Sequence, residues 1–214
     1  MISVNSISGG QTSAYIYANY PSDFNVFSLV RTNDISCLYP DSKVRQLVSD
    51  KLGQEFIGTL EEDTIIKTIL DLEQVYGHRI DWVTGKTFDE LVSNKNGKTF
   101  LPSAKFRKCS SELKVVPIAK WWYDNIREPI DMRIGFRANE QSRADTMIKR
   151  FDKNLMHTEK ISIGKDKNGR NIYDSFQWRT CSFPLIEDRI FKDTIVKYWK
   201  DKPVRFAYMN NCVG

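Results

Sequence analysis

The stretch Ile7-Ser8-Gly9-Gly10-Gln11-Thr12-Ser13 decides how the rest of this 214-residue chain is interpreted. It follows a β-type run at residues 2–7 and precedes a segment at about 14–20 that can be helical. Two adjacent glycines let the backbone turn tightly and direct several N–H groups at one point, and a helix start adds positive potential there. The stretch therefore indicates an anion-binding loop. A tight turn in which Thr12 or Ser13 caps the helix is the alternative that stays open.

The composition is that of an ordinary globular protein with a mild positive charge. Thirty-two basic and 27 acidic residues give a net charge of +5, which suits an anionic ligand but does not establish nucleic-acid binding. No apolar run approaches the roughly 20 residues that span a bilayer, and the N-terminus lacks the basic and apolar segments of a signal peptide. We expect a cytoplasmic protein with no membrane partner, in which residues 1–214 form one domain.

Beyond the loop, β-rich segments alternate with helical patterns, which predicts an α/β fold with a mainly parallel central sheet flanked by helices. In such sheets ligands bind at the carboxyl ends of the strands, where the strand order reverses. Asn168-Gly169 between two β-type runs predicts a hairpin, and residues 156–177 are the best candidate for an insertion. The further strands are predicted at residues 25–31, 79–83, 131–136 and 204–209, and the main helices at 41–52, 61–76 and 188–198.

Polar residues at the ends of two predicted strands are candidates for ligand contacts. Arg137 and Arg143 follow the strand at 131–136, and a guanidinium group matches phosphate or sulfate with two parallel hydrogen bonds. A solvated surface loop is the alternative for this pair. Asp34 follows the strand at 25–31, where it could hold a ribose hydroxyl or an adenine amine, or could simply turn the chain.

The cysteines show no C-x-x-C spacing and are expected to be free thiols in a reducing compartment. Cys109 stands apart because Arg107, Lys108 and Lys114 flank it, and nearby cations would lower the pKa of its thiol. It could be a nucleophile, a cluster ligand or an unremarkable surface thiol, and Lys114 could instead contact phosphate. The four cysteines are Cys37, Cys109, Cys181 and Cys212.

Four features spread over most of the chain resemble one protein family. The loop Ser8-Gly9-Gly10-Gln11-Thr12-Ser13 resembles the S-G-G-x-x-S PP-loop of the N-type ATP pyrophosphatases. Gly135-Phe136-Arg137 through Gln141-Ser142-Arg143 resembles the G-x-R…(Q/E)-S-R loop of the phosphoadenosine phosphosulfate (PAPS) reductase branch. The stretch from Cys109 through Leu113-Lys114 to Pro117 is similar to its C-x-x-x-(L/R)-K-x-x-P segment. Phe183-Pro184-Leu185-Ile186 is similar to its (F/Y)-P-L-(I/L) segment.

This resemblance implies an adenine nucleotide α-hydrolase fold, which is Rossmann-like with about five parallel strands. It implies an ATP or PAPS-type adenine nucleotide as ligand and an acceptor substrate that the residues do not identify. Whether Mg²⁺ accompanies the nucleotide stays open. A thioredoxin-type reductant would be needed for sulfonucleotide reduction, and a homodimer stays open. The resemblance assigns catalytic roles to Cys109, Arg137 and Arg143. It implies nucleotide contacts from loop residues 8–13 and from Gly135, and the positions of Asp34 and Lys114 add these two as candidate contacts.

The departures from the family restrict the expected chemistry. The reductases carry a Glu-Cys-Gly-Leu-His tail with the nucleophile, and this sequence has no such stretch. Cys212-Val213-Gly214 could begin a C-x-x-C in a chain that continues, and Cys109 and Cys212 would then be two iron–sulfur ligands. The 214 residues alone are not expected to hold a cluster. We expect sulfonucleotide reduction or ATP-dependent adenylation and sulfur transfer, and the alternative is a non-catalytic nucleotide- or nucleic-acid-binding accessory module.

Overall fold

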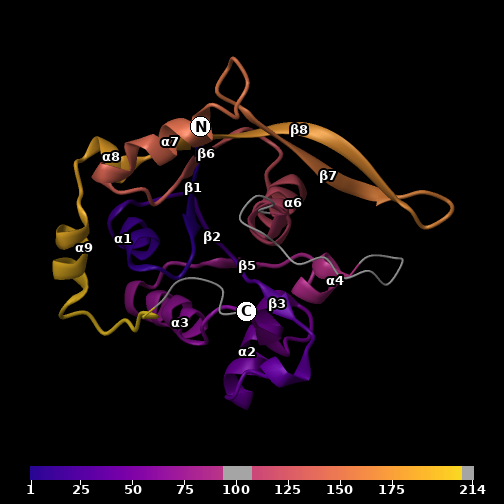
Figure 1. The fold of residues 1–214 in the computed structure, drawn as a ribbon, viewed down its shortest axis with the longest axis horizontal. Coiled ribbons are helices and arrows are strands. Elements are labelled where there is room, and N and C mark those ends of the chain that lie inside the picture. The colour runs from indigo at the N-terminus through magenta and orange to yellow at the C-terminus, as the bar shows by residue number, and fades with distance from the viewer. Residues whose placement is uncertain (94–107, 209–214) are drawn as a thin grey trace.

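A six-stranded sheet forms the centre of the computed structural model, which describes residues 1–93 and 108–208 (Figure 1). Its strands are β1 (Ile2–Ile7), β2 (Phe24–Ser28), β5 (Asp81–Val83), β6 (Ile130–Arg133), β7 (His157–Lys165) and β8 (Asn171–Ser182). A separate antiparallel pair consists of β3 (Arg31–Thr32) and β4 (Gly58–Thr59). The predicted α/β class with a mainly parallel sheet is confirmed.

The strand order places a reversal point beside the glycine-rich loop. The order across the sheet is β5-β2-β1-β6-β8-β7, with only the β7–β8 pair antiparallel. The chain begins at β1 in the middle, moves outward through β2 to β5, and then returns to the other side of β1 with β6. This arrangement is consistent with a Rossmann-like fold, in which the crevice between the two central strands is the usual ligand position.

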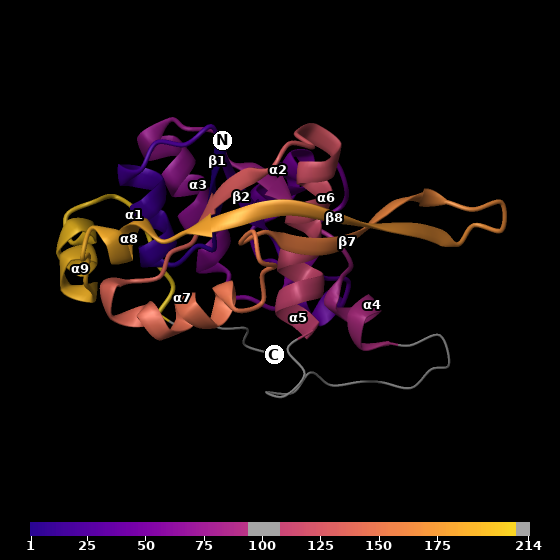
Figure 2. The same cartoon turned by 90° about the horizontal axis from the view of Figure 1, so that it is seen from above.

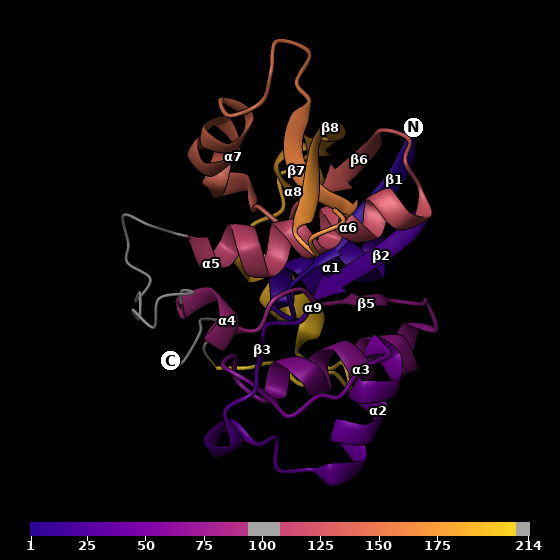
Figure 3. The same cartoon turned by 90° about the vertical axis from the view of Figure 1, so that its right-hand side faces the viewer.

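Helices cover both faces of the sheet. The helices α1, α2, α3 and α9 share one buried apolar cluster with one sheet face, and α6 packs against the other face. Figure 3 shows α6 running between β5 and the β7–β8 hairpin. The helix bounds are α1 (Gln11–Asn19), α2 (Ser42–Leu52), α3 (Thr64–Tyr76), α4 (Phe88–Val92), α5 (Lys108–Ser110), α6 (Val116–Asn125), α7 (Gln141–Ile148), α8 (Pro184–Glu187) and α9 (Lys192–Trp199), with short turns η1 (Ile35–Cys37), η2 (Ser111–Val115) and η3 (Ala138–Glu140).

Local sequence signals explain where several helices begin and end. Asp41 caps α2, because its Oδ1 accepts hydrogen bonds from the N–H groups of Lys43 at 2.9 Å and Val44 at 3.2 Å. Gly53 ends α2 in the left-handed conformation that glycine adopts without strain. Nothing among the described helices is both long and apolar enough to cross a membrane.

The predicted strand at residues 204–209 is wrong for the part that the structure describes. Residues 204–208 form no strand and run instead beside α3. The N–H of Arg205 donates to the Asp71 carboxylate at 3.0 Å, its guanidinium makes an ion pair with that carboxylate at 2.6 Å, and its carbonyl accepts from Thr68. These side chains of α3 therefore satisfy backbone groups that a sheet would otherwise pair. Met209 lies outside the described residues.

The predicted hairpin forms, and its second strand belongs to the central sheet. Residues 171–177 of β8 pair with β7, and residues 179–182 pair with β6 in parallel. Gly169 adopts a φ of +76° in the connecting turn, which explains the glycine after Asn168. Figure 2 shows the far end of the hairpin extending well beyond the rest of the molecule.

A half-buried histidine at the root of the hairpin is expected to make the stability of the fold depend on pH. Trp178 is completely buried, and its indole N–H donates to Nδ1 of His157 at 3.0 Å, so that nitrogen must carry no proton. Burial, and after it the positive charge of Arg179, lowers the pKa of His157 from 6.5 to about 4. Between these values the unfolded chain binds the proton and the folded chain does not, so stability falls as the pH drops from 6.5 toward 4.

We expect the free energy of unfolding, measured by urea titration across this pH range, to show that loss. His157→Gln is the matched control, because its amide oxygen can accept the Trp178 hydrogen bond and does not titrate. The variant should lose less stability than the wild type between pH 6.5 and 4. Parallel curves for the two proteins would show that His157 does not carry the effect.

Candidate functional site

A cleft of about 590 Å³ lies at the reversal point between the carboxyl ends of β1 and β6. One wall is the glycine-rich loop at residues 8–13, and the opposite wall is the segment at 134–137 with Arg143. Lys192 at the start of α9 and Tyr208 complete the lining. Two segments that are more than 120 positions apart in the sequence therefore face each other across one cleft, as the predicted ligand rim requires.

The glycine-rich loop is held in shape by its own hydroxyls. Ser13 Oγ accepts from the Ser8 N–H at 3.1 Å and donates to the Gly10 carbonyl at 3.1 Å. Gly10, not Thr12 or Ser13, is the N-cap residue of α1, and no side chain caps the helix, so the side-chain-capped turn is wrong. The first helical hydrogen bond runs from Ala14 to Gly10, which leaves the earlier N–H groups outside the helical ladder.

Two glycines in the cleft walls permit close packing that a side chain would prevent. Gly9 has a φ of +74°, and a Cβ atom there would lie 2.6 Å from Cγ2 of Ile65 on α3. A Cβ atom on Gly135 would lie 3.2 Å from the backbone nitrogen of Ser13. Gly9 therefore lets α3 support the loop from behind, and Gly135 lets the second wall contact the first helical turn of α1.

The two predicted arginines are held together by Glu140, which sequence reasoning missed. Arg137 Nε donates to one carboxylate oxygen of Glu140 at 2.8 Å, and the Arg143 guanidinium bonds to the other oxygen. Burial would raise the pKa of Glu140, but the hydrogen bonds from Arg137 and then Arg143 outweigh it and lower the pKa to about 2. The carboxylate thus stays ionised at neutral pH and fixes both cations. The sequence did contain a signal for this role, because Glu140 lies three residues from each arginine.

An aromatic stack supports the outer arginine. The Arg143 guanidinium lies 4.4 Å from the centre of the Phe136 ring, and Phe136 stacks on Phe183 at 5.5 Å with an angle of 5° between the rings. The segment beginning at Phe183 and the arginine loop therefore form one packed unit with α7. Arg137 uses only its backbone N–H and Nε for Glu140, and no hydrogen bond within the described ranges engages its terminal nitrogens.

Two other predicted nucleotide contacts have protein partners outside the cleft lining. The Lys114 ammonium makes an ion pair at 2.5 Å with Glu61, whose side chain is only 2% exposed. Asp34 is exposed and caps the turn η1, where its Oδ1 accepts from the N–H of Ser36 at 2.9 Å. This hydrogen bonding gives Asp34 the chain-turning role that the sequence left open.

The described residues include only part of the predicted cysteine site. Cys109 lies in α5, which leads through η2 into α6, and it does not belong to the described lining of the cleft. Arg107 and Cys212 lie outside the described residues, as does the side chain of Lys108. Two predictions therefore fall outside the described part of the chain: the effect of Arg107 and Lys108 on the Cys109 thiol, and the pairing of Cys109 with Cys212 as cluster ligands. In the part of the chain that the structure describes, no three His, Cys, Asp or Glu side chains gather as metal ligands.

The cleft combines donors that suit a tetrahedral anion. Residues at the start of α1 line the cleft together with three cations, which are Arg137 and Arg143 from the arginine loop and Lys192 from α9. Lys192 was not predicted, because nothing near it in the sequence links α9 to the loop. Comparisons of the chain with protein-family models, with curated proteins and with solved structures found no match.

Proposed function

We propose that this protein is a PP-loop enzyme, similar to the PAPS reductases, that binds an adenine nucleotide in the cleft between β1 and β6. The observation that carries the proposal is the contact of Gly135 with the first turn of α1. Because of this contact, the glycine-rich loop and the arginine loop line the same cleft. A phosphate or sulfate group placed there would accept hydrogen bonds from backbone N–H groups and from Arg137 together.

The proposed mechanism is electrostatic. Donors that are already in place stabilise negative charge that develops on the transferred group, and they need no reorganisation during the reaction. In an adenylation, an acceptor would attack the α-phosphorus of ATP, and the α–β anhydride bond would break to release pyrophosphate. In a sulfonucleotide reduction, a thiol would attack the sulfur of the nucleotide, and the bond from that sulfur to the phosphate oxygen would break to release the nucleoside phosphate. A dithiol reductant would then displace sulfite from the sulfur-bound thiol and would itself become a disulfide. The cleft residues support charge stabilisation in either reaction.

Isothermal titration calorimetry with ATP, adenylyl sulfate and PAPS tests the binding step. We expect one nucleotide to bind at one site per chain, and Gly135→Val to abolish that binding because its side chain would enter the contact with Ser13. If none of the three binds to the wild type, the proposal fails. Release of pyrophosphate from ATP on addition of an acceptor would then identify adenylation, and release of sulfite from PAPS with thioredoxin would identify reduction.

A further inference from the structure

The end of the β7–β8 hairpin is positively charged. We call residues 160–173 the arm. Its end, around the turn, extends beyond the body of the molecule (Figure 2), whereas Ile161 near its base is buried in the core. The arm contains the cations Lys160, Lys165, Lys167 and Arg170 and the single carboxylate Asp166, so it contributes +3 of the chain's +5. The carboxylates Glu159 and Asp174 flank the arm at its base, so the positive charge is concentrated toward the turn at its end.

The positive charge of the arm is not neutralised locally. All four cationic residues are exposed, and none makes an ion pair with a carboxylate within the described ranges. Asp166 shapes the turn, because its Oδ1 accepts from the N–H groups of Asn168 at 2.8 Å and Arg170 at 2.9 Å. The arm therefore presents a row of free cations on a narrow two-stranded ribbon, which is a shape that fits a nucleic-acid groove.

Apolar and aromatic surface accompanies these cations. Ile163 is 42% exposed, Ile172 is 44% exposed and Tyr173 is 47% exposed. The Lys160 ammonium lies 5.9 Å from the centre of the Tyr173 ring. Interleaved cations and an open aromatic ring are the combination that binds backbone phosphates and stacks bases in single-stranded nucleic acids.

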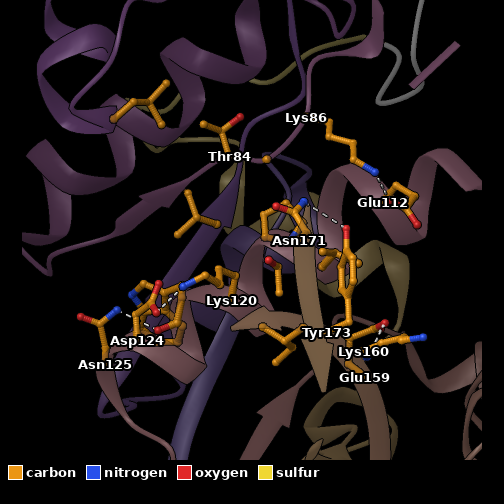
Figure 4. Close-up of a pocket in the computed structure, with 18 of the residues that line it drawn as sticks. Thr84, Lys86, Glu112, Lys120, Asp124, Asn125, Glu159, Lys160, Asn171 and Tyr173 are labelled. Atoms are coloured by element: carbon orange, nitrogen blue, oxygen red, sulfur yellow. Dashed lines mark hydrogen bonds and ion pairs between the residues drawn. The ribbon is translucent and has the colours of Figure 1, made fainter. Parts of the chain in front are cut away.

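A second cleft, of about 640 Å³, lies at the root of the arm, between α6, the end of β5 and the hairpin (Figure 4). Besides Lys160 of the arm, two lysines line this cleft, and both make ion pairs: Lys86 with Glu112 at 3.0 Å and Lys120 with Asp124. Tyr173 and Trp121 are among its lining residues. This cleft is therefore close to neutral and partly aromatic, so it suits an uncharged base, and the phosphates are left to the arm.

We propose that the arm binds the phosphate backbone of a polynucleotide and that the cleft at its root receives one of the bases. A second copy of this chain is a poorer occupant, because its own basic arm would repel this one. An anionic membrane surface would match the charge but would leave the aromatic cleft without a role. The inference goes beyond the nucleotide site between β1 and β6 and does not depend on it.

The test is fluorescence anisotropy with labelled 20-nucleotide DNA and RNA, single- and double-stranded, over a series of salt concentrations. The arm variant is Lys165→Ala, Lys167→Ala and Arg170→Ala combined. The matched control, Lys43→Ala, Lys197→Ala and Lys200→Ala, removes the same charge from exposed positions on α2, α9 and the residue after α9. We expect the arm variant to bind about tenfold or more weakly and to lose about two units of the log–log salt slope, whereas the control changes little.

Tyr173→Leu separates stacking from charge. We expect it to weaken binding of single strands about tenfold with an unchanged salt slope, since a base loses its stacking partner but no phosphate contact is removed. Equal effects of the two triple variants, or no polynucleotide binding at 50 mM salt, would overturn the proposal. Arm-dependent binding to phosphatidylserine vesicles without binding to nucleic acid would also overturn it. Calorimetry with adenine nucleotides on the arm variant reports separately on the other cleft.

Discussion

Replacing Arg137 with alanine is expected to weaken binding of the adenine nucleotide about a hundredfold, which corresponds to about 2.7 kcal/mol. Glu140 holds Arg137 through Nε and the backbone N–H, so the terminal nitrogens are already oriented when the ligand arrives. The Arg137 side chain is only 28% exposed, so water screens its charge less than it would on an open surface. Loss of a fixed, charge-assisted donor pair accounts for an effect of this size.

Two further variants show whether the planar fork or the charge matters. Arg137→Lys keeps the charge but cannot form two parallel hydrogen bonds, so we expect it to recover only part of the affinity. Arg150→Ala removes an exposed arginine just after α7, away from the described cleft lining, and should leave binding unchanged. Titration calorimetry with the nucleotide that the wild type binds measures all three. Equal affinity of wild type and Arg137→Ala would contradict the assigned role.

The expected effect of Arg143→Ala is smaller, which follows from its surroundings. Its side chain is 61% exposed and stacks on Phe136, so solvent competes for its charge. Glu140 bonds both arginines, and removing Arg143 leaves Arg137 with its own hydrogen bonds to that carboxylate. The two arginines that the sequence presents as equivalent are therefore unequal in the structure, with Arg137 as the inner contact and Arg143 as the outer one.

Local patterns were sufficient for much of the fold and for the two walls of the site. The glycine-rich loop, its strand and helix, the hairpin turn and the arginine loop are encoded within short windows, and the structure contains them. The alternation of strands and helices also predicted where the walls would meet, because parallel strands end on the same edge of a sheet.

The misses have a common physical cause, which is competition between distant groups. Residues 204–208 have a strand-like composition, but Thr68 and Asp71 hydrogen-bond to the backbone carbonyl and N–H of Arg205. Lys114 has the charge for a phosphate, but the buried carboxylate of Glu61 engages it. Lys192 enters the cleft only because α9 packs beside α1, as their shared apolar cluster shows. No pattern within a short window reports such contacts.

The largest loss of stability is expected from Gly58→Ala, at a position that no sequence motif marks. A Cβ atom on Gly58 would lie 1.8 Å from the carbonyl oxygen of Cys37, which is backbone and cannot rotate away. Gly58 is held on both sides, because β4 pairs with β3 and a β-bridge joins Gly58 to Leu38. We expect a cost of about 3 kcal/mol or more, and a melting temperature lower by roughly 6–12 °C for a chain of this length.

Gly53→Ala and Gly164→Ala separate this contact from the other costs of losing a glycine. Gly53 has open space around it but a φ of +65°, so alanine there suffers only backbone strain of about 1–2 kcal/mol. Gly164 also has open space around it, and its φ is not positive, so alanine there should change stability by less than about 0.5 kcal/mol. Urea unfolding should rank the losses Gly58, Gly53, Gly164. A Gly58 variant no less stable than the Gly53 variant would show that the segment at Cys37 moves aside.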